Sequence, residues 1–330
     1  MIRNVHFFSR RLIVSALVAV MVASASIVSA ADSYPSKPLR YVINNAPGGY
    51  GDITARVVTQ KMGDNMGQRI VVENKPGAGM IPSCMTVLQA PADGYTWAMT
   101  GGGVALSSVL FKQLPYNVLN DFVQISPLVG TDIVILVKTD SKFASLADVL
   151  KFAKSNPGKL NIGSSYIGST QHLAVELFKK QAGINALTVP YKSPQEVIVA
   201  LRSGAVDVAF DVLATSLAQI KEKQIRGLAI AGDTRFSGLP DLPTTAEAGL
   251  PGYEVTSWNS ISVKTGTPRP IIDRVNKEIG AALKAPDVKK KLADLGLNPL
   301  WLTPEQTRER MIAEIARWKK VIEDANIPRQ

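Results

Sequence analysis

The feature that most constrains this chain is a glycine-rich turn between a short strand and an amphipathic helix. The pattern predicts a strand over Arg40–Asn44, a Pro47-Gly48-Gly49 turn, and a helix from Asp52 that ends at Gly67. A second strand is expected over Ile70–Glu73. A turn of this kind presents unpaired backbone N–H groups where the helix dipole is positive. The sequence therefore predicts a place that can hold an anion.

A second turn of the same kind follows a strand predicted at Leu160–Gly163. Ser164 and Ser165 supply hydroxyl groups after this strand, and Gly168-Ser169-Thr170 opens the next helix, with Ser169 or Thr170 as its cap. A hydrogen bond to a charged group contributes roughly 1.5–3 kcal/mol net. Several donors converging from the two turns are therefore expected to form one anion site.

Strands and helices alternate through the first two-thirds of the chain, which predicts an α/β fold with mostly parallel sheets. Leu239–Pro251 is rich in proline and glycine and is expected to be irregular. The tail is expected to be helical, with a strong helix start at Thr303-Pro304. The other expected strands are Tyr95–Thr100, Ile133–Lys138, Ala186–Pro190, Val206–Asp211, Arg226–Ala231 and, as the last one, Trp258–Val263.

The N-terminus has the three-part pattern of a secretory signal peptide. A basic start with Arg3, Arg10 and Arg11 precedes the apolar run Leu12–Val28, and small residues around Ala30 offer a cleavage site. The run is shorter than the ~20 residues that a spanning helix usually needs, so an uncleaved anchor is the less favoured alternative. We expect residues 1–31 to be removed and the mature protein to lie in the periplasm. The choice between the general and the twin-arginine export route stays open.

Composition narrows the function further. Without the signal about 300 residues remain, enough for two lobes, and the formal charge falls from +10 to +7 because three arginines leave and no acid does. The basic residues are scattered without interleaved aromatics, which argues against nucleic acid as a partner. Cys84 is the only cysteine and His172 the only histidine of the mature chain, so neither an intrachain disulfide nor a histidine-rich metal site is expected. Nucleotide-binding glycine patterns are absent, and we expect no cofactor.

Taken in order, the motifs of this chain resemble those of the solute-binding proteins of tripartite tricarboxylate transporters, the Bug family. The resemblance covers essentially the whole mature chain. The residues that carry it are Tyr34-Pro-Ser-Lys-Pro38, Pro47-Gly48-Gly49 with Asp52, Val71–Gly79, Ala92–Tyr95, Leu114-Pro-Tyr116, Asp121-Phe122, His172-Leu-Ala174, Glu176–Phe178, Val189–Lys192, Val206-Asp207, Phe210-Asp211, Leu242–Thr244, Glu247–Gly249, Trp258 and Gly266-Thr-Pro268.

The resemblance implies an α/β, two-lobed type 2 periplasmic-binding-protein fold, a Venus flytrap with the ligand cleft between its lobes. Lobe 1 would comprise residues 32–131, with 254–330 returning to it, and lobe 2 residues 132–253. The two glycine-rich turns would face each other and grip a carboxylate group of the ligand, partly through ordered waters. The ligand-binding residues that it implies are Gly48, Gly49, Tyr50, Asp52, Ser164, Ser165, Gly168, Ser169, Thr170 and Asp211.

Three stretches depart from the usual pattern of the family, namely Asn44-Asn45-Ala46, Tyr166-Ile167 and Ser193-Pro194. The first two flank the expected cleft and would shape it for the distal part of the ligand, where Tyr50 and Tyr166-Ile167 offer surfaces for an apolar or aromatic ring. Because a carboxylate repels a carboxylate, Asp52 is expected to cap its own helix, to hold a water molecule, or to meet an amine.

The expected function is that of a periplasmic receptor that closes on a small organic carboxylate and delivers it to membrane carrier subunits. No bond is made or broken, so no catalytic residue is assigned. The ligand class stays open between dicarboxylates and tricarboxylates, acidic amino acids and aromatic acids, and a monomer is the default state. Two alternatives are a co-receptor for a sensor kinase and a hydrolase that uses a serine with His172, although the G-x-S-x-G elbow is absent.

Overall fold

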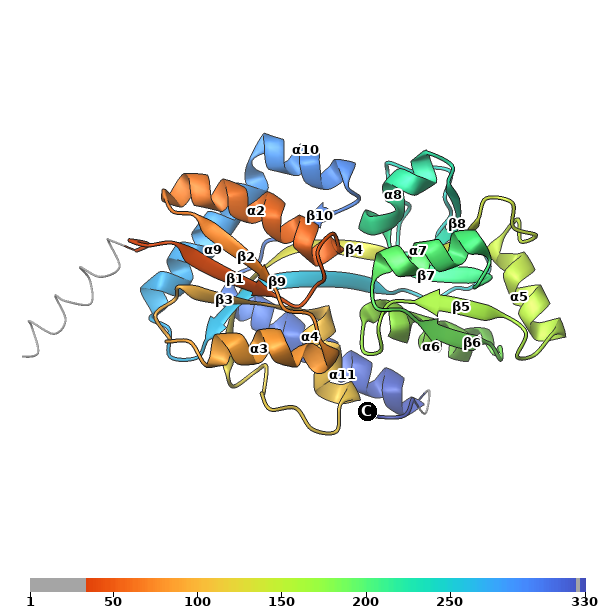
Figure 1. The fold of residues 1–330 in the computed structure, drawn as a ribbon, viewed down its shortest axis with the longest axis horizontal. Helices are drawn as coiled ribbons and strands as arrows, with labels where there is room; N and C mark the ends of the chain where they lie inside the picture. Colours follow the sequence, from red (N-terminus) through yellow and green to blue (C-terminus); the bar gives the residue numbers. More distant parts are fainter. Residues whose placement is uncertain (1–33, 325–326) are drawn as a thin grey trace, which may run out of the picture.

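The computed structural model describes residues 34–324 and 327–330, so the predicted signal peptide lies outside the described residues. The predicted alternation of strands and helices is confirmed (Figure 1). The first half contains β1 (Leu39–Ile43), α2 (Tyr50–Met66), β2 (Ile70–Asn74), a 3-10 turn (Ala78–Met80), α3 (Ile81–Leu88), β3 (Thr96–Gly101) and α4 (Gly102–Leu110).

The second half is reached through one long strand, β4 (Phe122–Lys138), and left through another, β9 (Thr256–Lys264). In Figure 1 these two strands run side by side across the middle of the molecule. Between them lie α5 (Leu146–Ser155), β5 (Asn161–Ser164), α6 (Thr170–Ala182), β6 (Leu187–Pro190), α7 (Pro194–Ser203), β7 (Val208–Val212), α8 (Leu213–Lys221) and β8 (Ile225–Ile230). The chain then returns to the first half through α9 (Arg269–Lys284), α10 (Pro286–Asp294), β10 (Asn298–Pro299) and α11 (Pro304–Asp324).

The strands form one continuous hydrogen-bonded order, β2-β1-β3-β9-β4-β7-β5-β6, with β8 and β10 also paired to β4. The prediction of mostly parallel sheets is only half right. The outer strands β1, β2 and β3, like β5, β6 and β7, pair in parallel, whereas β4 and β9 are antiparallel to each of their neighbours. The reason is topological, because β4 carries the chain out to the second half and β9 carries it back.

The change of partner along β4 marks where one half gives way to the other. Its residues from Phe122 to Asp132 pair with β9, and those from Ile133 to Lys138 pair with β7 or β8.

No helix among the described residues combines the length and the apolar character needed to cross a bilayer.

Three elements were not predicted from the sequence, and one was predicted too short. The helices α4 and α8 and the two-residue strand β10 were missed, and only the last third of β4 was expected. The missed helices follow their strands without a polar linker, as in Gly101-Gly102-Gly103, where no cap residue marks the start. The tail helix does begin as predicted, because Thr303 Oγ1 accepts the N–H of Gln306 and the Gln306 side chain accepts the N–H of Thr303.

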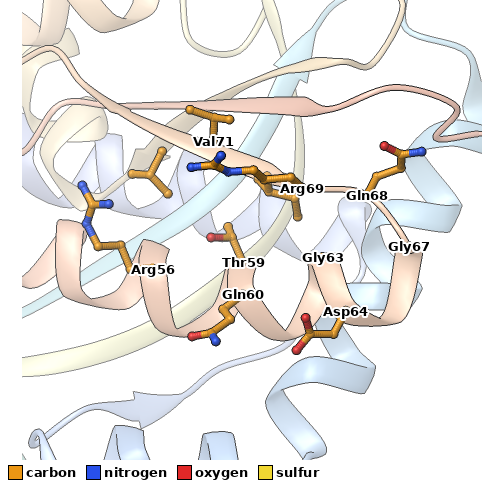
Figure 2. A pocket seen from close by; sticks show the side chains of 11 residues that line it. Arg56, Thr59, Gln60, Gly63, Asp64, Gly67, Gln68, Arg69 and Val71 are labelled. Atoms are coloured by element: carbon orange, nitrogen blue, oxygen red, sulfur yellow. The ribbon is translucent and has the colours of Figure 1, made fainter.

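A hollow of about 750 Å³ lies between α2 and β2. Figure 2 shows Arg56, Thr59, Gln60 and Asp64 on α2, Arg69 just before β2, and Val71 within β2. Because β2 is the last strand of the order, this hollow is a wide groove beside a sheet edge.

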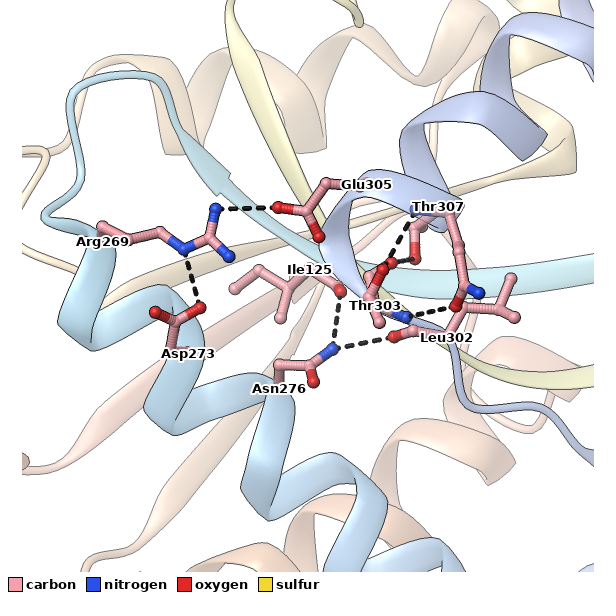
Figure 3. Close-up of polar contacts among 9 residues, drawn as sticks. Ile125, Arg269, Asp273, Asn276, Leu302, Thr303, Glu305 and Thr307 are labelled. Atoms are coloured by element: carbon pink, nitrogen blue, oxygen red, sulfur yellow. Dashed lines mark hydrogen bonds and ion pairs between the residues drawn. The ribbon is translucent and has the colours of Figure 1, made fainter.

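A polar network fixes the returning C-terminal segment to the first half of the molecule (Figure 3). The side chain of Asn276 on α9 donates to the carbonyls of Ile125 on β4 (3.0 Å) and of Leu302 before α11 (2.8 Å). At the surface, Arg269 pairs with Asp273 and with Glu305, at 2.7 and 2.8 Å. The buried amide holds three segments together, whereas the ion pairs are exposed to solvent.

We predict that Asn276→Ala destabilises the protein by about 2–4 kcal/mol, because two carbonyl groups beside a 9% exposed side chain lose their donor. The matched control Arg269→Ala is expected to cost less than about 1 kcal/mol, because exposed ion pairs contribute little. Urea unfolding of both variants measures the difference. An equal loss of unfolding free energy in the two variants would show that the buried amide of Asn276 does not hold the returning segment in place.

Candidate functional site

The starts of α2, α4 and α6 meet the strand β9 at a narrow cleft between the two halves. Little of its interior is open to water, about 50 Å³, which is the space of a few water molecules. Its lining residues are Asn44, Asn45, Ala46, Gly49, Tyr50, Pro76, Met80, Met99, Thr100, Gly103, Val104, Ser165, Tyr166, Ser169, Thr170, Gln171, Lys192, Pro194, Ser257, Trp258 and Asn259.

Five of the ten sequence-predicted site residues lie in this lining: Gly49, Tyr50, Ser165, Ser169 and Thr170. The other five, Gly48, Asp52, Ser164, Gly168 and Asp211, lie beside or behind it. The structure thus brings both predicted turns to one cleft, and the contribution of each residue to ligand binding stays a prediction.

The first turn uses its two glycine amides internally, which corrects the expected set of donors. The N–H of Gly48 donates to Asp52 Oδ2 at 3.0 Å, and the N–H of Gly49 donates to the carbonyl of Ala46 at 3.1 Å. Helix geometry instead leaves the next amides of the first turn of α2, those of Tyr50 and Gly51, without intrahelical acceptors. The amides available for an anion in this turn therefore begin at Tyr50, two residues after Gly48.

Asp52 supports the turn from behind and does not line the cleft. Besides Gly48, its carboxylate accepts hydrogen bonds from Arg56 Nε (3.0 Å) and Asn74 Nδ2 (2.9 Å). Burial alone would raise the pKa of Asp52, but the donors of Arg56, Gly48 and Asn74 outweigh it and hold the pKa below its ordinary value. Asp52 therefore stays ionised at neutral pH and holds the turn through its hydrogen bond with Gly48.

In the second turn, Ser164 and Ser169 make local hydrogen bonds, whereas the hydroxyl of Ser165 has no partner among the described residues. Ser169 caps α6 by accepting the N–H of His172 at 3.1 Å, and Ser164 donates to the carbonyl of Ser165 at 3.2 Å. The Oγ of Ser165 is buried in the lining and has no partner among the described residues. Gly168 adopts φ +86°, and a Cβ there would lie 3.2 Å from the ring of Phe111 in the other half.

Asp211 ends β7 behind the cleft and is fully buried. Its oxygens accept the N–H of Val212 (2.8 Å) and the hydroxyls of Thr215 (2.6 Å) and Ser216 (3.0 Å). Burial raises the pKa of Asp211 above its ordinary value in spite of these donors. The residue holds the start of α8 and does not reach the lining.

Two functional candidates on β9 were missed from the sequence, Ser257 and Asn259, whereas Trp258 between them was noted only as part of the family resemblance. Ser257 joins the two turns, because its Oγ lies 2.7 Å from the hydroxyl of Tyr50 and 3.5 Å from Thr170 Oγ1. Alternating polar and apolar residues also occur in ordinary half-buried strands, so no local signal marked these positions. The run Gly101-Gly102-Gly103 after β3 was a signal, since it is a third glycine-rich turn at a helix start.

Contacts between the halves hold the cleft narrow. Gln195, in the first turn of α7, donates to the carbonyl of Gly48 at 3.2 Å. Tyr166 packs with the hydrophobic cluster of the first half that contains Met80, Tyr116 and Trp258. The three departing stretches also border the cleft, through Asn44, Asn45 and Ala46, through Tyr166, and through Pro194, whereas Ile167 is 41% exposed.

The charges of the cleft are unusual for an anion site. Among the described residues that line it, Lys192 is the single charged one, and it is exposed. Binding of an anion would therefore depend on hydroxyls, amides and helix N-termini rather than on an ion pair. The groove beside α2 contains Arg56 and Arg69 but no helix start, and it is open to solvent.

His172 lies in the first turn of α6 and is half-buried. Burial lowers its pKa below the ordinary value, and Glu176 opposes this effect. Its Nδ1 has no hydrogen-bond partner within residues 34–324 and 327–330.

Of the described residues, no three of His, Cys, Asp and Glu are grouped so as to hold a metal ion.

A family model, "Tripartite tricarboxylate transporter family receptor", matches residues 54–327 of this chain. The chain belongs to this family. The match begins just after the first glycine-rich turn and includes the second turn and all of β9.

Relatives of this receptor agree with the assignment. This chain is 31% identical to Protein BugT of Bordetella pertussis, over 94% of this chain and 96% of that protein. The structure of the periplasmic binding protein BugD has a TM-score of 0.84 at 29% identity and covers 90% of this chain and 100% of BugD. The R. palustris protein Rpa4515, solved with adipate, has a TM-score of 0.86 at 31% identity and covers 89% of this chain and 99% of that one.

These findings confirm the predicted Bug-family identity and the two-lobed type 2 periplasmic-binding-protein fold. They also identify the chain as a solute receptor and not an enzyme, so the hydrolase alternative is set aside. Receptors of this family are periplasmic.

We predict that Asp132→Asn stabilises the receptor at pH 7.5 by about 1–3 kcal/mol. Asp132 lies on β4 opposite Thr256, where burial and the nearby Asp233 raise its pKa to about 6. A carboxyl with a raised folded-state pKa makes the folded state less stable as the pH rises from 3.8 to above 6. The advantage of Asn should therefore be present at pH 7.5 and absent near pH 4. Thermal unfolding across this range measures it, and a gain that does not depend on pH would contradict the assignment.

We also predict that Gln195→Ala weakens ligand binding about 2–10-fold, because it removes a contact that exists only when the halves are close. Gln195 is exposed, so the unliganded melting temperature should hardly change. Calorimetric titration compares this variant with Gln219→Ala on α8, which lies outside the lining. Equal affinities of all three proteins would show that the contact does not support closure.

Proposed function

We propose that this receptor captures a small organic carboxylate in the cleft and delivers it to the membrane carrier subunits of a tripartite tricarboxylate transporter. Residues 1–31 would direct export to the periplasm and be removed. Residues 32–131 with 254–330 would move as lobe 1, residues 132–253 as lobe 2, and the mature protein would act as a monomer. Closure of the lobes then gives the carrier a shape that differs from the open form.

One observation carries the proposal: the first turns of α2 and α6 meet through Ser257. Tyr50 and Thr170, one from each turn, both lie within hydrogen-bonding distance of its hydroxyl. Because the starts of both helices line the same cleft, they bring the positive ends of two helix dipoles and backbone amides without intrahelical acceptors to it. The lining offers a carboxylate no acidic neighbour, because Asp52 and Asp211 lie outside it. A relative solved with adipate supports the same ligand chemistry.

The test is a thermal shift of the mature chain from Asp32 against aliphatic, aromatic and amino acids. A ligand at about 100 times its dissociation constant stabilises by roughly 2.7 kcal/mol, which should raise the melting temperature by about 5 °C. Saturable binding of at least one carboxylate is expected. A folded protein that binds no member of the panel would overturn the proposal.

We further predict that Thr170→Val weakens carboxylate binding about 5–20-fold, because the turn loses a hydroxyl at the meeting point with Ser257 while the side chain keeps its shape. Stability should change by less than about 1 kcal/mol, because Thr170 follows the Ser169 cap and does not form it. Thr86→Val on α3 is the matched control, since its hydroxyl bonds only the carbonyl of Pro82. Equal affinities of the two variants would place the carboxylate elsewhere.

A further inference from the structure

The side chain of Asn259 is buried in the cleft without a partner. It is 2% exposed, and neither Nδ2 nor Oδ1 finds a hydrogen bond among the described residues. It lies on β9 opposite Gly101 of β3 and Val129 of β4, so both neighbouring strands fix its backbone. A buried amide with both ends unsatisfied costs free energy. Such a group in a ligand cleft points to a ligand that completes it.

Two further buried groups of the same lining are also unpartnered, Trp258 Nε1 and Ser165 Oγ. Among these three side chains, the Oδ1 of Asn259 is the one group that can only accept a hydrogen bond. No guanidinium belongs to the described lining, and the ammonium of Lys192 is exposed. Apart from the exposed Lys192, the described lining therefore offers only neutral polar groups, so a second charged group of a ligand buried beside Asn259 would find no counter-charge there.

The planar amide of Asn259 selects between ligand groups, because it presents donors on one side and an acceptor on the other. A carboxylate satisfies the Nδ2 donors but faces the Oδ1 with an acceptor, and an ammonium group satisfies the Oδ1 but finds no carboxylate in the described lining. A methyl group satisfies neither atom. A hydroxyl or a carboxamide both donates and accepts, so it completes the amide without a charge. An exchange of the two amide atoms leaves this reasoning unchanged.

We propose that the ligand is a monocarboxylate that carries a neutral hydrogen-bonding group, a hydroxyl or a carboxamide, which Asn259 recognises. The carboxylate would bind at the starts of α2 and α6, and the carbon chain would lie against Met80, Met99 and Val104 of the lining. This inference rests on the proposed function and names the ligand class for the same cleft. It separates this receptor from its relative solved with adipate, which carries a carboxylate at each end.

The test uses acids of matched shape that differ only in the terminal group. Straight-chain acids of four, five and six carbons, together with para-substituted benzoates, each carry a terminal methyl or hydrogen, hydroxyl, carboxamide, carboxylate or ammonium group. Titration calorimetry on the mature chain should show the hydroxyl or carboxamide form binding at least tenfold more tightly than the other forms of the same length. Equal or tighter binding of the dicarboxylates would overturn this inference and leave the proposed function intact. Binding of no acid at all would overturn both.

Two variants link the preference to Asn259. Asn259→Leu should bind the hydroxyl-ended acid at least tenfold more weakly and lose discrimination against the methyl-ended acid. Asn259→Asp should shift the preference to the ammonium-ended acid, because it places a carboxylate where the ligand group lies. Ser257→Ala is the matched control on the same strand and should weaken all end groups alike. If a folded Asn259→Leu kept the wild-type order, recognition by Asn259 would be excluded. If Asn259→Leu did not fold, the order of affinities of the wild-type protein for the five end groups, together with the preference of Asn259→Asp, would still test the proposal.

Discussion

The antiparallel pairing of β4 with β9 is the constraint on which the rest of the structure depends. It runs from Phe122 opposite Lys264 to Asp132 opposite Thr256, and β4 then continues into the second half. Two register shifts, at Gln124/Ser126 and Pro127/Val129, interrupt the pairing before Gly130 meets Trp258. Because a shift of one residue exchanges the two faces of a strand, this register decides which side chains of β9 reach the cleft. The strands that connect the two halves thus also supply one wall of the cleft.

The first glycine-rich turn is also held in place by residues that lie outside it. Asp52 can accept the N–H of Gly48 because Arg56 and Asn74 hold its carboxylate in place. Gly51 leaves room for the side chain of Asn45, since a Cβ at this position would lie 2.0 Å from the Asn45 Oδ1 and would force that side chain to move. The polar residue that departs from the family pattern is therefore packed directly on the helix start.

Local signals in the sequence predicted most of the elements. Gly67 ends α2 with φ +66°, and Ser145 and Ser169 cap their helices through hydrogen bonds within three residues, so a short window contains the cause of each. The use of the Gly48 amide could not be predicted, because it depends on Asn74 at the end of another strand. Nor could the role of Ser257 and Asn259, whose neighbours in the cleft lie about 90 or more residues away in the chain. The long strand β4 was shortened in the prediction because Ser126-Pro127 interrupts an otherwise strand-like run.

The near absence of charged side chains from the cleft has a kinetic consequence. Fixed dipoles in a closed site are screened by salt much less than exposed ion pairs, so the dissociation rate of the ligand should depend little on ionic strength. The positive charge of the mature chain lies outside the cleft and acts over a longer range on an approaching anion. Salt would then slow capture while leaving residence time nearly unchanged. A receptor of this design separates the force that attracts its ligand from the forces that retain it.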